Sequence, residues 1–237
     1  MSFASALLIT GFFLFFAAIV YLAFRSSRKY QSEKEQQLQT LGFQAPDSAP
    51  TRLQSRVEAL YLNQEDAELA LDNIYHRKEL DQELYIFNLY NTKGEGTELG
   101  EEIFGMISSQ LALPNFSLIT IPDFDRDSLI GGLMDKMLDK VMAFAQKRLG
   151  LQLVEFPDRP EYQDRFAVFG RDPAAVRDFL RDKWLDSLRS DPLPLQIAGT
   201  GDFLTIDFSM SGSYGDENHD MISQYNKFRE VCRIFMS

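Results

Sequence analysis

The longest uninterrupted run of apolar residues lies at the start of the chain. Residues 3–24 contain 22 positions without a charged side chain. At about 1.5 Å per residue, a helix of this length spans roughly 30 Å, the thickness of a bilayer's hydrocarbon core. The run predicts a single transmembrane helix that contacts the lipid bilayer through residues 3–24. The alternative is a cleaved signal peptide, but such peptides begin with a basic segment and have a shorter apolar core.

Basic residues follow the apolar run directly. Arg25, Arg28 and Lys29 lie just after it, and no Lys or Arg precedes it. Because basic residues flank membrane helices on the cytoplasmic side, the N-terminus is expected outside and the globular domain in the cytoplasm. The single cysteine agrees with a reducing compartment.

Small residues recur at every seventh position of the apolar run, at Ala4, Gly11 and Ala18. Such a stripe could let two helices approach closely, so a homodimer through these residues is one expectation. The alternative is that small residues are simply common in membrane helices. No strict Gly-xxx-Gly motif favours pairing.

The next segments predict how the chain is divided. Residues 25–41 are polar and free of Pro and Gly, so they are expected to extend the helix, and Gly42 suits its end. Two prolines follow within 44–50. We therefore predict a transmembrane helix with its cytoplasmic extension at 1–41, a linker at 42–50 and an acidic globular domain at 51–237.

Within the predicted domain, the apolar spacing changes repeatedly between helical and strand periods. Spacings of three and four predict helices, whereas alternation or short apolar runs predict strands. Asp172 and Pro173 suit a helix cap and a first helical position. In chain order the pattern predicts a helix at 52–62, strands at 69–75, 84–90, 102–108 and 116–121, a helix at 125–149, strands at 151–156 and 166–169, a helix at 172–188, strands at 195–198 and 203–210, and a helix at 221–235.

Strand pairs joined by short turns and punctuated by helices indicate an α+β fold. We expect a mainly antiparallel sheet with helices packed on one face, preceded by the single N-terminal transmembrane helix. Residues 80–83 suit a hairpin connection. The strand at 84–90 is apolar on both faces, which predicts a central position. The strand at 69–75 alternates, which places the following His76 on a solvated face.

Composition and charge exclude several functions. The chain has 45% apolar residues, which is typical of a folded protein. Its net charge of −11 would repel the phosphates of nucleic acid. Apart from the basic cluster at 25–29, it would also repel anionic lipid. One cysteine and two histidines cannot form an internal disulfide or an ordinary structural zinc site. The sequence therefore predicts no catalytic residue, no cofactor and no metal.

Three acidic residues at alternating positions imitate a calcium loop. Asp123, Asp125 and Asp127 have the right spacing, but Ser128 and Met134 stand where an EF-hand needs Gly and Glu. We favour the alternative that these acids cap the helix predicted at 125–149. The glycines at 94–100 do not follow a phosphate-loop spacing, and the glutamates among them would repel phosphate.

No nucleophile has a recognisable partner. Ser211 stands where a nucleophile elbow at Ser213 would need its first glycine, and His76 and His219 are both expected at the surface. Cys232 lies on the apolar stripe of the last predicted helix, which indicates a buried hydrophobe, although nearby arginines leave a reactive thiol as an alternative. Met134, Met137 and Met142 could line an adaptable groove or pack in the core.

One segment carries a family resemblance. In the region of residues 156–208 the chain contains EFPDRPEYQDRFAVFGRDPAAVRDFL, which begins at Glu155, and later GDFLTIDF. The segment resembles bacterial membrane-anchored domains of unknown function. The resemblance implies a bacterial inner (plasma) membrane location and imports no activity. The matching residues occupy expected cap, core and strand positions: Tyr162, Phe166, Val168, Asp172, Val176, Arg177, Leu180 and Leu204.

Two functions remain from these patterns. The first is a non-enzymatic, membrane-tethered cytoplasmic domain that binds a protein partner, since a tether raises local concentration and an acidic surface selects a basic partner. The alternative is a module that binds a small apolar or lipid ligand between the sheet and the methionine-bearing helix. An enzyme is the least favoured, because no titratable groups occur at a recognisable spacing.

Overall fold

The chain divides into two compact units, residues 1–43 and 44–237, and each is described by itself. Most of the apolar run at 3–24, including Ala4, Gly11 and Ala18, lies outside the described residues. No helix among the residues that are described is long and apolar enough to cross a membrane. The computed structural model describes residues 21, 25, 28–48, 50–61, 68–93, 97–121, 150–163, 165–181, 183, 185, 188, 195–208 and 220–236.

The helix of the first unit covers residues 28–40 and ends at Gly42, which has a φ of 78°. The Gly42 N–H donates to the carbonyl of Gln39, and the Phe43 N–H donates to the carbonyl of Leu38, both at 2.9 Å. These two bonds and the burial of Leu38 and Phe43 form a Schellman motif. Glycine is favoured there because it adopts a positive φ without strain.

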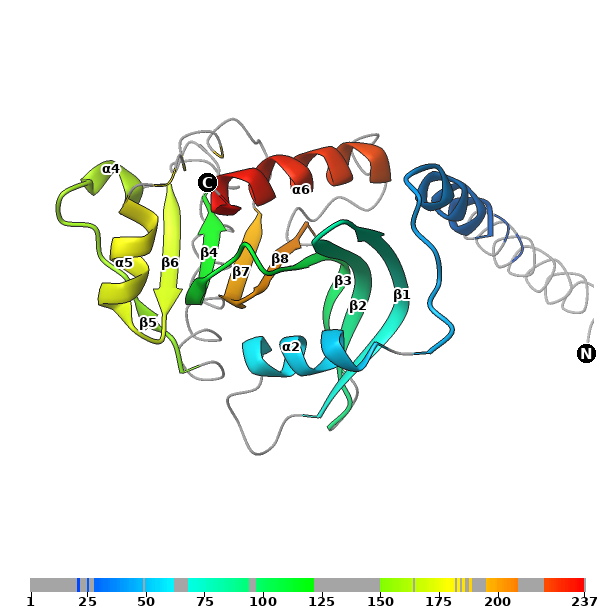
Figure 1. The fold of residues 1–237 in the computed structure, drawn as a ribbon, viewed down its shortest axis with the longest axis horizontal. Coiled ribbons are helices and arrows are strands. Elements are labelled where there is room, and N and C mark those ends of the chain that lie inside the picture. Colours follow the sequence, from blue (N-terminus) through cyan, green and yellow to red (C-terminus); the bar gives the residue numbers. More distant parts are fainter. Residues whose placement is uncertain are drawn as a thin grey trace, which may run out of the picture. The chain divides into compact units, whose positions relative to one another are not determined.

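The second unit is built on one eight-stranded sheet in which all described pairs are antiparallel (Figure 1). The spatial order is β1-β2-β3-β8-β7-β4-β6-β5. This confirms an α+β fold with an antiparallel sheet. The strands are β1 (Leu69–Glu79), β2 (Gln82–Asn91), β3 (Thr97–Ser108), β4 (Leu113–Thr120), β5 (Gln152–Leu153), β6 (Phe166–Gly170), β7 (Gln196–Gly201) and β8 (Phe203–Asp207), and the helices are α2 (Thr51–Tyr61), α4 (Pro160–Gln163), α5 (Pro173–Arg181) and α6 (Met221–Met236).

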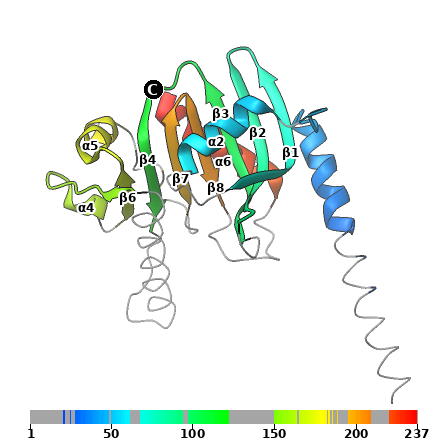
Figure 2. The ribbon, with the colours of Figure 1, turned by 90° about the horizontal axis from the view of Figure 1, so that it is seen from below.

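Helices cover both faces of the sheet, so the prediction that they pack on one face is wrong. Leu53 and Val57 of α2 pack in one cluster with Ile103 of β3. The next residue of β3, Phe104, points to the other face and contacts Phe228 of α6, with ring centroids 5.4 Å apart. Figure 2 shows α2 and α6 on opposite sides of the strands. The physical reason is that the inner strands are apolar on both faces, and each face needs a cover.

The α6 face continues through an aromatic cluster to α5. Phe116 of β4 stacks on Phe235 of α6, with centroids 5.5 Å apart, and both contact Phe179 of α5. The cap predicted for α5 is confirmed, since the N–H groups of the second and third helical residues donate to the Asp172 carboxylate at 3.1 Å. The helix ends at Arg181 rather than at residue 188.

A bulge in β1 reverses the face on which His76 was predicted. Asp72 pairs with Asn88 but Tyr75 pairs with Ile86, so β1 has one extra residue at this point. Asn73 there has a φ of 48°, and its N–H is bound by the Asp72 carboxylate at 2.8 Å. Because one extra residue exchanges the two faces of a strand, His76 lies on the α2 face, half-buried opposite Tyr85.

Other sequence expectations differ mainly in extent. The β1–β2 turn contains only Leu80 and Asp81, since Gln82 already belongs to β2. Strand β2 is buried on both faces as predicted, although it lies next to the edge strand. The strand expected at 151–156 is reduced to β5, and the short helix α4 was not predicted.

Candidate functional site

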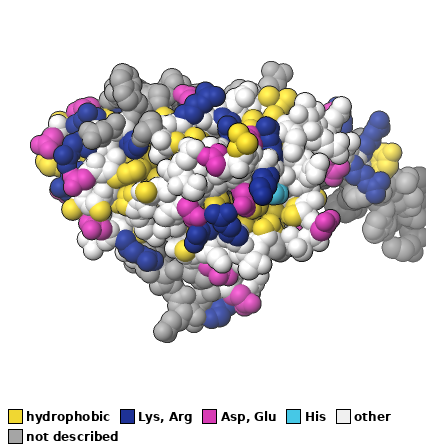
Figure 3. Space-filling model, in the orientation of Figure 1, with side chains coloured by type: hydrophobic (Ala, Val, Ile, Leu, Met, Phe, Trp, Pro, Cys, Tyr) yellow, Lys and Arg dark blue, Asp and Glu magenta, His cyan; other side chains and the backbone are white. Residues whose placement is uncertain are grey.

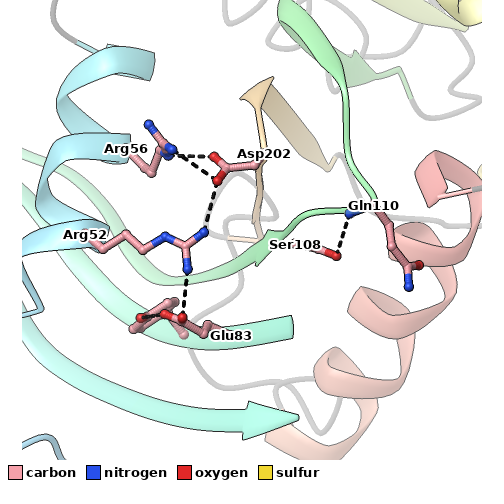
Figure 4. Close-up of polar contacts among 7 residues, drawn as sticks. Arg52, Arg56, Glu83, Ser108, Gln110 and Asp202 are labelled. Atoms are coloured by element: carbon pink, nitrogen blue, oxygen red, sulfur yellow. Dashed lines mark hydrogen bonds and ion pairs between the residues drawn. The ribbon is translucent and has the colours of Figure 1, made fainter. Parts of the chain in front are cut away.

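Two arginines of α2 contact one aspartate at the end of the sheet where β1 turns into β2. Arg52 and Arg56 lie one helical turn apart and therefore share a face of α2. Oδ2 of Asp202, in the β7–β8 turn, accepts a hydrogen bond from each at 3.1 Å, and Nε of Arg56 lies 2.6 Å from Oδ1 (Figure 4). The turn has only two residues, and Gly201 provides its positive φ of 57°.

The same network extends across the sheet to β2 and β1. Nη1 of Arg52 donates to Oε1 of Glu83 at 2.8 Å, and the Tyr85 hydroxyl donates to Oε2 of Glu83 at 2.6 Å. The ring of His76 stacks on Tyr85, with centroids 4.9 Å apart. The hydrogen bond from Tyr85 lowers the pKa of Glu83. Burial, and then the carboxylate of Glu83, raise the pKa of Tyr85. We name these six residues the α2 clamp: His76, Tyr85, Glu83, Arg52, Asp202 and Arg56.

The α2 clamp is balanced in charge, which limits what it can bind. Its two guanidinium groups face two carboxylates, and the arginine side chains are 50% and 40% exposed. Figure 3 shows Lys and Arg side chains interspersed with Asp and Glu on this view of the molecule. Paired guanidinium groups have no excess charge for an anion, so the clamp serves to hold the first turns of α2 on the sheet.

A different polar group lies at the other end of α2, on an otherwise apolar face. The hydroxyl of Tyr61 is 3.4 Å from Oγ1 of Thr205, which is in turn 3.3 Å from the carbonyl oxygen of Ala198. Asp207, two residues beyond Thr205 on the same face, is only 5% exposed. Burial raises the pKa of Tyr61, and the negative charge of the nearby Asp207 carboxylate also raises it.

The polar group continues across β7 and β4. Gln196 pairs with Asp207 across the sheet, and its amide nitrogen is 3.5 Å from Oγ of Ser117. On β3, a Cβ on Gly100 would lie 2.8 Å from Oδ2 of Asp207, so glycine leaves the room that this carboxylate needs. We name the following set the buried polar row: Tyr61, Thr205, Asp207, Gln196 and Ser117.

The buried polar row offers hydrogen bonding rather than recognisable catalysis. It contains one carboxylate, one amide and three hydroxyls, and no histidine, cysteine or lysine that would activate a nucleophile. Among the described residues, no group of three or more His, Cys, Asp or Glu could hold a metal ion. Polar groups that converge on an apolar face can fix the orientation of a small ligand. The same arrangement also occurs in proteins as an internal hydrogen-bond network without a ligand.

Several strand ends around the buried polar row are joined to acidic segments of the sequence. Register places the starts of β1, β3, β6 and β7 at one end of the sheet, together with the ends of β2, β4 and β8. Four of the segments attached to these ends contain three, four, three and three acidic residues, with Lys93 and Arg126 as their basic residues, whereas Arg165 directly precedes β6. We name these segments the acidic end: 62–68, 92–102, 121–128 and 208–220.

Of the candidate residues that the sequence singled out, the structure describes His76 and Cys232. Cys232 is buried on α6, and burial raises its pKa, which agrees with a packing role rather than a reactive thiol. Ile222 of the same predicted stripe is 36% exposed. Several other candidates lie outside the described residues: Asp123, Asp125, Asp127, Ser128, Met134, Met137, Met142, Ser213 and His219.

Seven of the eight residues of the resembling segment occupy the cap and core positions expected of them, and Arg177 does not. Asp172 caps α5, and Arg177 donates from Nε to the carbonyl of Glu155 at 2.7 Å. The remaining six are buried in the core: Tyr162, Phe166, Val168, Val176, Leu180 and Leu204.

Sequence reasoning missed the α2 clamp and the buried polar row. The spacing of Arg52 and Arg56 was a usable signal, because it puts two cations on one helix face. Asp207, at the end of the apolar run FLTID, was another signal, since charged residues are rarely buried without a partner. No known family, no curated protein and no solved structure matches this chain.

Proposed function

We propose that the chain is a single-pass, membrane-tethered cytoplasmic domain that binds a protein partner with a basic surface through its acidic end. The observation that carries the proposal is that strand ends lying at one end of the sheet are joined to four acidic segments of the sequence. Opposite charges steer association and select partners, and a tether confines that association to the membrane.

The apolar run supports the location. Residues 3–24 provide the length of a membrane helix, and Arg25, Arg28 and Lys29 favour a cytoplasmic domain. Reporter fusions to both termini in bacterial cells test the orientation. A periplasmic C-terminus contradicts it. Mass spectrometry of the protein extracted from membranes tests the anchor, because a product shortened at residues 20–30 indicates a cleaved signal peptide instead.

Charge reversal at the acidic end tests partner binding. The variant E65K/D66K/E68K reverses all three acids of the first segment. Its control, D47K/D178K/E230K, makes the same change in net charge at positions outside the acidic end. Both proteins are cross-linked in cells, purified from membranes and compared with wild type. We expect a partner that wild type and control retain and the variant loses. Equal retention by all three contradicts recognition through the acidic end.

The buried polar row favours a second function, the binding of a small ligand against the α2 face. Asp207 is buried on the α2 face of the sheet, with Gln196 opposite it on β7. Native mass spectrometry of the purified full chain tests this function. A small molecule that co-purifies with wild type and is lost in Asp207→Asn supports it, whereas wild type without any bound species contradicts it.

A further inference from the structure

The linker residue Gln44 is hydrogen bonded to the outer edge of the sheet. Its N–H donates to the carbonyl of His76 at 3.0 Å, and the His76 N–H donates to the carbonyl of Gln44 at 2.8 Å. These two bonds form an antiparallel bridge to β1, which has β2 on its other side. Gln44 therefore belongs structurally to the sheet, although a linker was predicted there.

Other features also close this edge. Nε2 of Gln54, on α2, donates to the carbonyl of Leu69 at the start of β1 at 3.2 Å. The bulge at Asn73 twists the strand, and the N–H of Asn73 is bound by Asp72. Bulges and covering groups are the usual means by which proteins protect an edge strand. The bridge to Gln44 is the contribution of the linker to this protection.

The bridge is connected by side chains to α2. His76 carries the bridge on its backbone, and its ring stacks on Tyr85. Nε2 of His76 is buried without a hydrogen-bond partner, so packing against Tyr85 holds the ring. Tyr85 bonds to Glu83, and Glu83 binds Arg52 in the first turn of α2. The linker is thus attached at Gln44, and α2 begins seven residues later at Thr51 under the clamp.

We propose that residues 44–48 form a strap whose docking is coupled to α2. Gln44 is hydrogen bonded to the outer edge of β1 at His76. Through the contacts of His76 with Tyr85, of Tyr85 with Glu83 and of Glu83 with Arg52, the docking of Gln44 stabilises the first turn of α2. When the strap undocks, His76 loses its backbone partner, its stack on Tyr85 loosens, and the first turn of α2 is released. A pull on the segment that precedes Gln44 therefore reaches α2 without any change in the remote strands.

Amide hydrogen exchange of the full chain in detergent micelles tests this coupling. Gln44→Pro removes the N–H that bonds His76, whereas Gln44→Ala keeps the backbone and changes only an exposed side chain. Losing about one hydrogen bond corresponds to a population change of about five- to tenfold. We expect exchange in Q44P to accelerate by about that factor at His76, and also at Gln54 and Ser55 of α2. In Q44A all three amides should be unchanged.

The result at α2 decides the proposal. Acceleration at His76 alone, with Gln54 and Ser55 unchanged, overturns the coupling. Equal acceleration in β4, which four strands separate from β1, also overturns it, because global destabilisation then explains the change. Tyr85→Phe removes the hydroxyl that links to Glu83, so Q44P in that background should no longer affect α2. If Q44P does not fold, Gln44→Gly keeps the N–H but makes the undocked linker more flexible, so it should accelerate exchange at the same amides by a smaller factor than Q44P.

Discussion

Asp202 is the residue on which the α2 clamp depends most, because it contacts both arginines. Asp202→Asn keeps the size of the side chain and removes its charge. The backbone carbonyl of Asp202 still accepts the bond from the Ser108 N–H at 2.9 Å, so the turn itself is preserved. Partly exposed ion pairs contribute about 0.2–1 kcal/mol each. Since Asp202 pairs with Arg52 and Arg56, we expect a loss of about 1 kcal/mol in the free energy of unfolding.

Urea denaturation at two salt concentrations measures this loss and its origin. Urea is uncharged, so ionic strength can be set independently. The Debye length falls from about 10 Å at 0.1 M salt to about 3 Å at 1 M, and the D202N deficit should shrink accordingly. Asp178→Asn is the matched control, because Asp178 is exposed and pairs with Arg181 on its own helix. A deficit that is absent, or that is unchanged by salt, refutes an electrostatic clamp.

Three further predictions concern packing, titration and the domain boundary. Gly170→Ala should lower the free energy of unfolding by about 1–3 kcal/mol in urea titrations, because its Cβ would lie 2.5 Å from Cγ2 of Val176. Glu83 has a lowered pKa, so its stabilisation is complete above the ordinary glutamate pKa and is lost as pH falls through the lower folded value. Glu83→Gln should therefore reduce the slope of stability against pH in that acidic range. A fragment of residues 44–237 should unfold at a higher urea concentration than 51–237, since only the longer one retains the two Gln44 bonds. Equal midpoints for the two fragments would contradict a docked Gln44.

Local sequence signals predicted the fold class and most elements, because their causes are local. Asp172 caps α5 through hydrogen bonds that its own side chain makes, and Gly42 ends a helix through its own positive φ. The short turn at Leu80 and Asp81 joins two strands whose apolar patterns were recognisable separately. Such features depend on a few consecutive residues and can be read without knowing the tertiary structure.

The order of strands was not predictable in the same way. Strands β3 and β4 are consecutive in sequence, yet the hairpin of β7 and β8 lies between them. Apolar residues such as Phe203 and Leu204 indicate burial on both faces of β8, but they do not indicate which strand will be its neighbour. The prediction of helices on one face was wrong for the same reason, because an apolar pattern indicates burial but not the element that packs against it. Strands apolar on both sides require two covers, and the pattern alone does not say which helix supplies each.

The position of His76 shows why the α2 clamp could not be predicted from the alternation of apolar and polar residues along β1. Alternation assigns faces correctly only while the register is unbroken, and the extra residue at Asn73 exchanges the faces of all later residues in β1. His76 therefore moves from the predicted solvated face onto Tyr85, where it joins the clamp. Asn at this position is compatible with a positive φ, but many Asn residues in strands have ordinary geometry. The bulge determines which residues of β1 face α2, and Asn73 is the one residue in the sequence that indicates it.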